Sequence, residues 1–574
     1  MRWVEAGGCE CLRMVGVVVR DSAWRTLTPS RLVERARGER WTVDGRTVVG
    51  AGALLWRLAL SPRAHGMDVQ AAMRARGNVL TNRSGLVVLL PATIFAGARF
   101  VVRHTGSSEE RGVLPRGIAP HQPMLDAVAL RLSVARGPAL AFTFAGDTFE
   151  MEDQRNWLDP SFKLYNRPLS KPFPYRIRDG AEVEQRIEID VVRMPVHTAS
   201  NGQRRRSRRN TRLAPIPAIG VATAPGRVPT RSVVTQALAR ARPAFVLHRT
   251  NAGATGLHAA ARLARALGAE LRVETFGEGS ILADALQDVK SRCVAAYFSG
   301  PQVDAVLADD ATESAGGTFA DFVMLNRNGI VRSSDRATFA LCPTVHARDD
   351  RSLIETLEAM PVVFAQARRL AGARPVDVGP CTLLRRLVPA NGKPAIRGPE
   401  GTRDAYDVDP RQSEHIAAAW LACVIALAAE AGIASVCTFE AAGSRGLVCR
   451  TANAGMQGAS AIDANSSSYQ LLCAFAEAGA AGITLLALDV RRGAAFRVHG
   501  KSLELWLVDL SGRPRGLPRG AGTSTPDLHL KRGRQGARWA PLRRADRIDA
   551  YAVARLRSVE AMRDEEDTVR AWCR

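Results

Sequence analysis

The chain has 574 residues, of which 46% are apolar and 24% charged, a composition typical of globular proteins with several domains. Lysine and arginine together number 79 against 56 acidic residues, which gives a formal net charge of +23. Only six of these basic residues are lysines, and the arginines are spread along every segment apart from one cluster, RRRSRR at 204–209. This pattern indicates a compositional bias rather than a phosphate-binding surface, so we expect no nucleic-acid partner.

The ten cysteines form no CxxC pair, and several lie inside apolar runs. This distribution favours buried thiols in a reducing, cytoplasmic compartment over a disulfide framework or a zinc site. The first residues, MRWVEAGGCECLR, carry acids where a secretory signal needs an apolar core. The most apolar helix, predicted at 416–429, is too short to cross a bilayer, so we expect a buried helix and no membrane partner.

The first 195 residues predict an antiparallel β-sandwich. Short β-rich runs alternate with turn residues, as in GLVVLLPATIF (85–95), RFVVRHTG (99–106), LAFTFAGDTFEM (140–151) and VEQRIEIDVV (183–192). No helical period is sustained for long. Residues 196–212 follow as an Arg-rich polar linker.

From residue 213 to 480, apolar runs alternate with amphipathic or apolar helices. We count eight strand candidates, from AIGVAT, AFVLHRT, ELRVETF and CVAAYFSG through ADFVMLNRN, TFALCPTVH and VDVGPCTLL to ASVCTFE. Nearly all are followed by a helical segment, which favours a closed (β/α)₈ barrel of the TIM type. A doubly wound open sheet is the alternative, but no GxGxxG follows the first strand.

Residues 481–557 return to β-like runs and predict a small C-terminal β-domain, with ITLLALDVRR, AFRVHG, LELWLVDLSG and AYAVARLR as its strands. Residues 558–574 form a charged tail in which the sequence indicates no function.

Reacting groups of such a barrel belong at the C-terminal ends of its strands. Those ends offer His248, Arg249, Glu274, Asn326, Asn328, His346, Asp349, Asp350, Glu440 and Arg445. Glu440 follows the apolar strand VCTF just before a Gly-containing turn, so it can face the barrel mouth as a general acid or base. Alternatively, it pairs with Arg445 to close the rim.

His346 is a candidate base, with Asp349 or Asp350 as its orienting acid. The stretch DDRSLIE also fits helix-cap chemistry, and for Asp350 we favour the cap. Glu274 lies in VETF, where strand alternation can direct it outwards.

A metal site built from His346, Asp349 and Glu440 is conceivable, but no HxH or HExxH spacing supports it, so we expect neither metal nor cofactor. The absence of GxSxG argues against an α/β-hydrolase mechanism.

The window FEMEDQRNWLDPSFKLYNRPL (149–169) is dense in acids, bases and aromatic rings. As one wall of a site, it would use Asp153 to bind sugar hydroxyls and Trp157 to pack against the apolar face of a sugar ring. As a structural ion network, it would contain the short-range pairs Glu152–Arg155 and Asp159–Lys163.

Several strings, in this order along the chain, resemble the D-apionate lactonase family. They are VLTNRSGLVVLLP (79–91), GDTFEMEDQRNW (146–157), CPTVHARDD (342–350), DPRQSEHIAAAW (409–420), TFEAAGSRG (438–446) and DAYAVARL (549–556). The resemblance implies a β-domain, a TIM-type barrel and a second β-domain. The chain departs from the family's pattern at Ala441, Ala442 and Ser444, and at Cys342-Pro343. These differences affect the expected identity of the substrate more than the expected class of reaction.

The resemblance further implies a carboxylic ester hydrolase that opens the sugar lactone D-apionolactone to D-apionate in apiose catabolism. Glu440, His346 and Asp349 are the expected catalytic residues, and Asn326, Arg445, Glu274, Asp153 and Trp157 are expected to bind substrate. Two alternatives stay open: a barrel glycosidase that pairs Glu440 with Glu274 or Asp349, and a non-catalytic carbohydrate-binding relative. The sequence does not indicate an oligomeric state.

Overall fold

The computed structural model describes most of the chain and divides it into two compact units. The described residues are 1–194, 212–223, 228–229, 231–250, 256–275, 293–298, 313–330, 334–384, 408–443, 445–448, 466–516, 527–533, 536–542, 547–557 and 565–573. One unit comprises Met1–Asn156 and Pro160–Arg205, and the other comprises Trp157–Asp159 and Arg206–Arg574. Apart from Arg212, the predicted linker at 196–212 lies outside the described residues.

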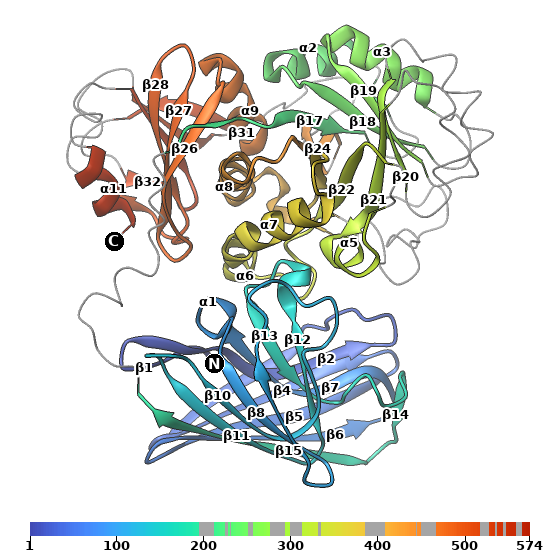
Figure 1. Cartoon of the computed structure of the whole chain (residues 1–574), viewed down its shortest axis with the longest axis vertical. Coiled ribbons are helices and arrows are strands. Elements are labelled where there is room, and N and C mark those ends of the chain that lie inside the picture. Colours follow the sequence, from blue (N-terminus) through green and yellow to red (C-terminus); the bar gives the residue numbers. More distant parts are fainter. Residues whose placement is uncertain are drawn as a thin grey trace, which may run out of the picture. The chain divides into compact units, whose positions relative to one another are not determined.

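The first unit is built on one antiparallel sheet of 15 strands, which run side by side in the lower part of Figure 1. The strands are β1 (Arg2–Ala6), β2 (Cys9–Asp21), β3 (Arg31–Arg37), β4 (Arg40–Val49), β5 (Gly52–Arg63), β6 (Gly66–Arg76), β7 (Val79–Pro91), β8 (Arg99–His104), β9 (Glu109–Val113), β10 (Met124–Ser133), β11 (Ala139–Ala145), β12 (Phe149–Asp153), β13 (Ser161–Tyr165), β14 (Tyr175–Ile177) and β15 (Glu182–Arg193). Two short helical turns, α1 (Ala92–Phe95) and η1 (Gln154–Trp157), interrupt them.

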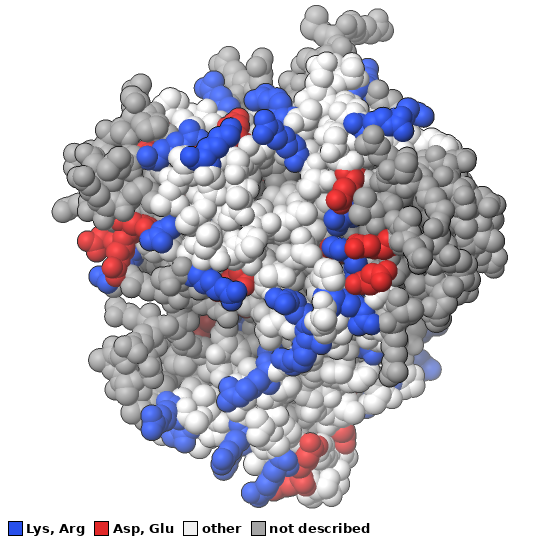
Figure 2. All heavy atoms as spheres, turned by 45° about the horizontal axis from the view of Figure 1, so that its top comes forward, with Lys and Arg blue, Asp and Glu red and all other residues white. Residues whose placement is uncertain are grey.

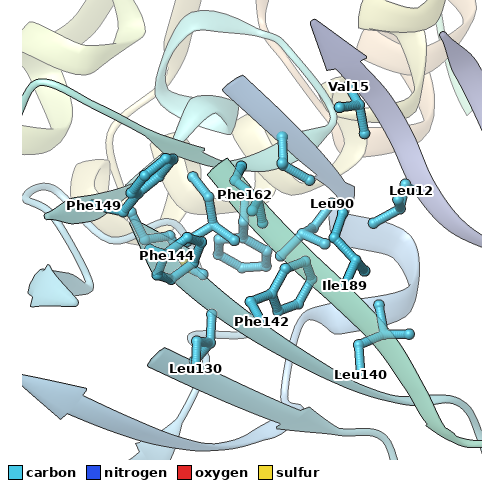
Figure 3. Packing of buried hydrophobic residues seen from close by; sticks show 14 of the residues in the cluster. Leu12, Val15, Leu90, Leu130, Leu140, Phe142, Phe144, Phe149, Phe162 and Ile189 are labelled. Atoms are coloured by element: carbon cyan, nitrogen blue, oxygen red, sulfur yellow. The ribbon is translucent and has the colours of Figure 1, made fainter. Parts of the chain in front are cut away.

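The predicted sandwich is one continuous, curled sheet rather than two separate ones, and it encloses one large and one smaller apolar cluster. Figure 3 shows Phe149 of β12, Phe162 of β13 and Leu90 of β7 converging on Phe142 and Phe144 of β11. Alternation along the strands directs the intervening residues to the opposite face. That second face carries Glu150, Glu152 and Lys163 of the window at 149–169.

The middle of the chain forms a parallel sheet of eight strands in the order β17 to β24. They are β17 (Ala218–Ala222), β18 (Phe245–Thr250), β19 (Glu270–Thr275), β20 (Cys293–Phe298), β21 (Glu313–Asp321), β22 (Arg336–Leu341), β23 (Val376–Cys381) and β24 (Ser435–Ala442). Because β17 pairs in parallel with β24 as well as with β18, the sheet closes on itself. A ninth short strand, β25 (Gly446–Val448), pairs in parallel with the C-terminal end of β24.

The described helices between these strands are α2 (Ser232–Ala241), α3 (Leu257–Leu267), α5 (Phe322–Asn328), α6 (Asp350–Glu355), α7 (Met360–Ala371), α8 (His415–Ala431) and α9 (Ser467–Ala478), with the 3₁₀ turns η4 (Thr356–Glu358) and η5 (Pro410–Ser413). The segments that follow β19 and β20 lie outside the described residues. The strand predicted at ADFVMLNRN was wrong, because the strand is the Gly-containing β21 and the apolar residues Phe322, Val323 and Leu325 belong to the buried side of α5.

A polar network crosses the interior of the closed sheet. The guanidinium of Arg272 on β19 donates to Ser435 Oγ on β24 at 2.9 Å and lies 3.6 Å from the carboxylate of Asp377 on β23. Asp377 also pairs with Arg336 on β22 through Nε at 2.6 Å. Since β19 is adjacent to neither β23 nor β24, these contacts pass through the barrel interior.

Helix α8 is the buried apolar helix predicted from the sequence. All its residues from His415 to Ala429 are buried, because α8 packs against the barrel strand β24 and also against strands of the C-terminal sheet. A helix that is apolar on every side needs such neighbours all around. None of the helices among the described residues is both long and apolar enough to cross a membrane.

The C-terminal part forms a seven-stranded antiparallel sheet that includes one strand from before the barrel. Its strands are β16 (Ala214–Pro215), β26 (Gly482–Asp489), β27 (Gly493–His499), β28 (Leu503–Asp509), β30 (Leu528–Gly533), β31 (Gly536–Pro541) and β33 (Val553–Leu556), beside the small pair β29 (Arg515–Gly516) and β32 (Arg547–Ile548). β16 pairs with β26.

The charged tail contains a further helix, α11 (Glu565–Cys573), which packs on β26 and β27. Trp572 is fully buried; its Nε1 donates to the carbonyl of Val508 at 3.0 Å, and the guanidinium of Arg515 lies 4.0 Å from its ring centre. Helix α11 therefore contributes to the core of the C-terminal sheet.

The described basic side chains lie in small groups on the face drawn in Figure 2. Figure 2 shows them scattered over the visible face among uncharged residues, with acidic side chains between them. This distribution is what a compositional excess of arginine produces.

Replacing Trp572 by Ala should lower the free energy of unfolding by about 3–5 kcal/mol, because it leaves a large cavity in a fully packed site. Urea denaturation followed by circular dichroism measures the change. The matched control is Trp41→Ala at a tryptophan that is 39% exposed, with an expected change below about 1 kcal/mol. Equal effects for the two variants would show that α11 does not contribute to the core.

Candidate active site at the barrel mouth

The contacts of Arg272 with Ser435 and Asp377 identify the interior side of β19, and the pairing of β18 with β19 extends this assignment to β18. Arg272 points into the barrel, so alternation places Glu274, two residues later, on the same side. Arg249 of β18 pairs with Glu274, with Nε and Oε2 2.9 Å apart, and both side chains are buried. Glu274 therefore faces inwards, as the site prediction requires, and is engaged by a cation.

His248 directly precedes the inward-facing Arg249, so strand alternation places it on the outer side of β18. It is completely buried, and its Nδ1 lies 2.7 Å from the hydroxyl of Thr223. A side chain at Gly256, which precedes α3, would approach its ring to 3.0 Å. His248 is thus packed beneath the start of α3, away from the barrel interior.

A β-bulge turns Glu440 towards the interior. In the pairing of β17 with β24, Gly220 lies opposite Cys437 but Ala222 lies opposite Glu440, so β24 contains one extra residue. Without it, alternation from the inward Ser435 would send Glu440 outwards. With it, Glu440 shares the side of Ala222, which packs with Phe245 and Cys437 in the barrel core.

The carboxylate of Glu440 pairs with Arg445 from the turn after β24. Arg445 Nη2 lies 3.1 Å from Glu440 Oε1, and the side chain of Glu440 is 12% exposed. The sequence left open whether Glu440 is functional or pairs with Arg445; the structure contains the pair at the C-terminal end of the strand. The Glu440 carboxylate is therefore largely shielded from solvent and holds the Arg445 guanidinium in place.

His346 is held by an acid that the sequence analysis assigned elsewhere. Its Nδ1 lies 2.5 Å from Asp159 Oδ2, and Trp157 contacts the imidazole edge-on, with ring centres 5.6 Å apart. All three residues belong to the second compact unit. The imidazole is 10% exposed and follows β22 at its C-terminal end. An imidazole oriented by a carboxylate is the usual arrangement of a general base.

His346 contacts an acid other than the two that were predicted to orient it. Asp349 is the N-cap of α6: its carboxylate accepts from the backbone N–H of Ser352 at 3.0 Å and from the Ser352 hydroxyl at 2.8 Å. Asp350, which the sequence favoured as the cap, lies in the first turn and pairs with Arg411. Two acids in sequence fit the cap equally well, and the backbone direction selects the first.

Asn326 and Asn328 lie on α5 rather than on a loop after a strand, because the preceding strand ends earlier than predicted. The Asn326 side chain is buried and accepts from Gln366 Nε2 of α7 at 3.3 Å. This contact joins two helices of the outer layer. It gives Asn326 a packing role, and its predicted role in substrate binding stays untested.

The ion pairs of the window at 149–169 differ from the predicted ones. Arg155 pairs with the buried Asp153, Nη2 to Oδ2 at 2.6 Å, and its guanidinium also donates to three carbonyls of residues 115–117. Lys163 pairs with Glu152 across the β12–β13 ladder. Asp153 therefore fixes a loop of the first unit, and its predicted role in substrate binding is not supported by these contacts.

Asp377 and Arg272 were missed by the sequence analysis. Burial acts to raise the pKa of Asp377, but the contacts with Arg336 and Arg272 outweigh it and hold the pKa below its usual value. The signal in the sequence was a charged residue at the start of an apolar strand, as in VDVG and ELRV. Within the described ranges, no group of three His, Cys, Asp or Glu side chains is arranged to hold a metal ion.

Two family models match the chain. Residues 1–194 match the model described as D-apionate lactonase, N-terminal domain, and residues 302–479 match the model described as D-apionate lactonase, TIM barrel domain. A curated D-apionate lactonase of Brucella anthropi is 27% identical over 505 residues, which cover 78% of this chain and 80% of that protein.

Several solved structures have a detectable likeness to the chain. An α-galactosidase from Geobacillus stearothermophilus is 11% identical and covers 96% of this chain and 87% of its own, with a TM-score of 0.22. An α-galactosidase from Lactobacillus brevis is 9% identical, covering 96% and 85%, with a TM-score of 0.22. A galactose mutarotase related enzyme from Lactobacillus acidophilus is 8% identical, covering 32% and 85%, with a TM-score of 0.21.

Two substitutions separate the cap from a catalytic role at Asp349. Asp349→Ala should lower the free energy of unfolding by about 1 kcal/mol, whereas Asp349→Asn should leave it nearly unchanged because Asn caps as well as Asp. If the carboxylate only caps α6, kcat of Asp349→Asn stays within about twofold of wild type, since no transition-state contact is removed. A loss of about 100-fold or more in the stable Asn variant would instead mark Asp349 as catalytic.

Proposed function

The chain belongs to the D-apionate lactonase family, and on that premise we propose that it hydrolyses D-apionolactone to D-apionate at the mouth of its barrel. The family relationship makes the chain an enzyme that acts on a lactone ester in apiose metabolism. The identity of the lactone and the mechanism are proposals. The observation that carries the mechanism is the contact of 2.5 Å between His346 and Asp159.

We infer a complete (β/α)₈ barrel, with the site at the C-terminal ends of β22 and β24. The closed order of eight parallel strands and the helices that follow six of them support this architecture. One strand, β23, lies between β22 and β24, so their ends are about 10 Å apart. In this proposal the lactone ring lies between His346 and Glu440.

In this mechanism His346 is the general base. Asp159 holds the Nδ1 side of the imidazole, so Nε2 takes the proton of a water molecule as its oxygen attacks the lactone carbonyl. Asp159 also stabilises the imidazolium that forms. When the ring C–O bond breaks, the same proton passes to the departing alkoxide. The products are the free acid and its new hydroxyl group.

Arg445 supplies positive charge for the carbonyl oxygen as it becomes an oxyanion. Its contact with Glu440 limits the positions that the guanidinium can take, which is the preorganisation that such stabilisation requires. We assign the proton transfer to His346 rather than Glu440 because the Glu440 carboxylate is already engaged by this guanidinium. Trp157, beside His346, offers an aromatic face for the apolar side of the sugar ring.

The glycosidase alternative receives no support from the described contacts. It needs a second carboxylate beside Glu440, and both candidates have other partners: Glu274 pairs with Arg249, and Asp349 caps α6.

A cytoplasmic location also remains a proposal. Eight cysteines among the described residues are free thiols, and six of them are buried. Burial raises the pKa of the Cys381 thiol to about 12, which keeps it protonated and unreactive. Such thiols are compatible with a reducing compartment.

The proposed base is tested with His346→Gln. Gln keeps a polar side chain at this position but cannot take the proton, so kcat on D-apionolactone should fall by about 10²–10⁴-fold while the fold is retained. Acid release in a weakly buffered solution measures the rate, across a panel of sugar lactones. A wild-type enzyme that opens none of them would remove the proposed activity; an unimpaired His346→Gln would remove only the base.

The Arg445–Glu440 pair is tested with Arg445→Gln and Glu440→Gln. Loss of an oxyanion donor should lower kcat by about 10²–10³-fold in Arg445→Gln with little change in KM. Glu440→Gln frees the guanidinium without removing it, and a smaller loss of about tenfold is expected. A Glu440→Gln loss larger than that of Arg445→Gln would reverse the assignment and make Glu440 the base.

A further inference from the structure

Arg83 is a buried cation in the N-terminal unit that neither the fold nor the proposed mechanism explains. It lies on β7 within the family string VLTNRSGLVVLLP and is 3% exposed. A register shift in the pairing of β2 with β7 sets Arg20 opposite Arg83 but Asp21 opposite Thr81, so Asn82 is an extra residue. Bulges of this kind redirect the next side chain.

The Arg83 guanidinium is held by aromatic rings rather than by acids. Its central carbon lies 3.5 Å from the ring centre of Tyr165 and 5.7 Å from that of Trp24. Among the described residues it makes no ion pair and no side-chain hydrogen bond, and its Nε is buried without a partner. A guanidinium stacked in this way keeps its fork of N–H donors for a carboxylate or phosphate.

The nearby carboxylates do not neutralise Arg83. Glu152 is engaged by Lys163, and Glu150 accepts from the Tyr165 hydroxyl and from the backbone N–H of Leu169 at 2.9 Å. Burial lowers the pKa of Lys163 to about 8; the pair with Glu152 opposes this shift, and the charges of Arg83 and Arg20 add to it. The cluster therefore retains a positive field, which an anion would compensate.

Glu150 adds a second recognition element on the same sheet face. Phe149 and Phe162 point into the apolar core (Figure 3), so Glu150 and Tyr165 project from the opposite face of β12 and β13. Glu150 is fully buried, and its Oε2 has no hydrogen-bond partner among the described residues. A buried acceptor without a partner is costly and suits a ligand hydroxyl.

We propose that Arg83 and Glu150, arranged around Tyr165, form a site for a hydroxy acid, with Arg83 binding the carboxylate and Glu150 accepting from a hydroxyl. This assignment rests on the proposed function, because opening a sugar lactone produces a carboxylate and a hydroxyl in one molecule. An unopened lactone lacks the carboxylate. The site therefore favours the product over the substrate, and the N-terminal domain is a product-binding module.

The test is calorimetric titration of the full chain with D-apionate, acetate and erythritol at low salt. D-apionate should bind at least about tenfold more tightly than either acetate or erythritol, because only it offers both groups. Arg83→Gln should weaken D-apionate binding by at least about tenfold. The matched control, Arg111→Gln, changes an exposed arginine of the same sheet and should leave binding unchanged.

Arg83→Lys covers the case in which Arg83→Gln does not fold. It keeps the charge but loses the fork, so binding should weaken by at least about threefold. Equal affinity in the folded Arg83 variants and wild type, or D-apionate binding no tighter than erythritol or acetate, would overturn the site. His346→Gln, which should no longer hydrolyse D-apionolactone, should still bind D-apionate at Arg83. If the wild type hydrolyses the lactone but D-apionate binding does not depend on Arg83, only this inference is contradicted. If D-apionate binding depends on Arg83 but the wild type hydrolyses no lactone, only the proposed function is contradicted.

Discussion

The candidate active site depends on the closure of the parallel sheet, and the buried charges inside it specify how the strands meet. Arg272 reaches across the interior to Ser435 and Asp377, and Arg336 joins the same carboxylate from the neighbouring strand. Removing one partner of a buried ion pair costs about 3–5 kcal/mol, because an uncompensated charge remains. Charges in the interior therefore penalise any other strand alignment and fix which strand ends share the mouth.

Two polar pairs at that mouth have complementary chemistry. His346 with Asp159 can move a proton, and Arg445 with Glu440 can stabilise negative charge on an oxygen. In the proposed mechanism, each pair combines a reacting group with a carboxylate that orients it. Lactone opening needs both functions, because water must lose a proton while the carbonyl oxygen gains charge.

Much of the architecture was predictable from the sequence because hydrophobic periodicity is a local property. The β-rich first part, the alternation in the middle and the buried helix α8 all follow from it. The strand at β21 was missed because Gly316 and Gly317 weaken its pattern, while the apolar run of α5 imitates a strand. Helix α11 was missed because the acidic residues of its first turn suggested an exposed tail, although Trp572 near its end is buried.

The site was harder to predict, since its contacts join residues distant in sequence. Glu440, Arg445 and His346 were proposed from their position after strands, but the contact partner of His346 lies 187 residues earlier in the chain. The bulge that turns Glu440 inwards depends on the alignment of β17 with β24 and has no local signature. Between Asp349 and Asp350, only the backbone geometry identifies the cap.

The most direct measurement of the central claim is kcat of Asp159→Asn on D-apionolactone. Asn keeps the size and the hydrogen-bonding capacity of the side chain but neither carries the charge nor enforces the tautomer in which Nε2 accepts a proton. The account predicts a fall in kcat of about 10²–10⁴-fold with nearly unchanged KM. A variant that folds and retains kcat within about twofold of wild type would contradict it.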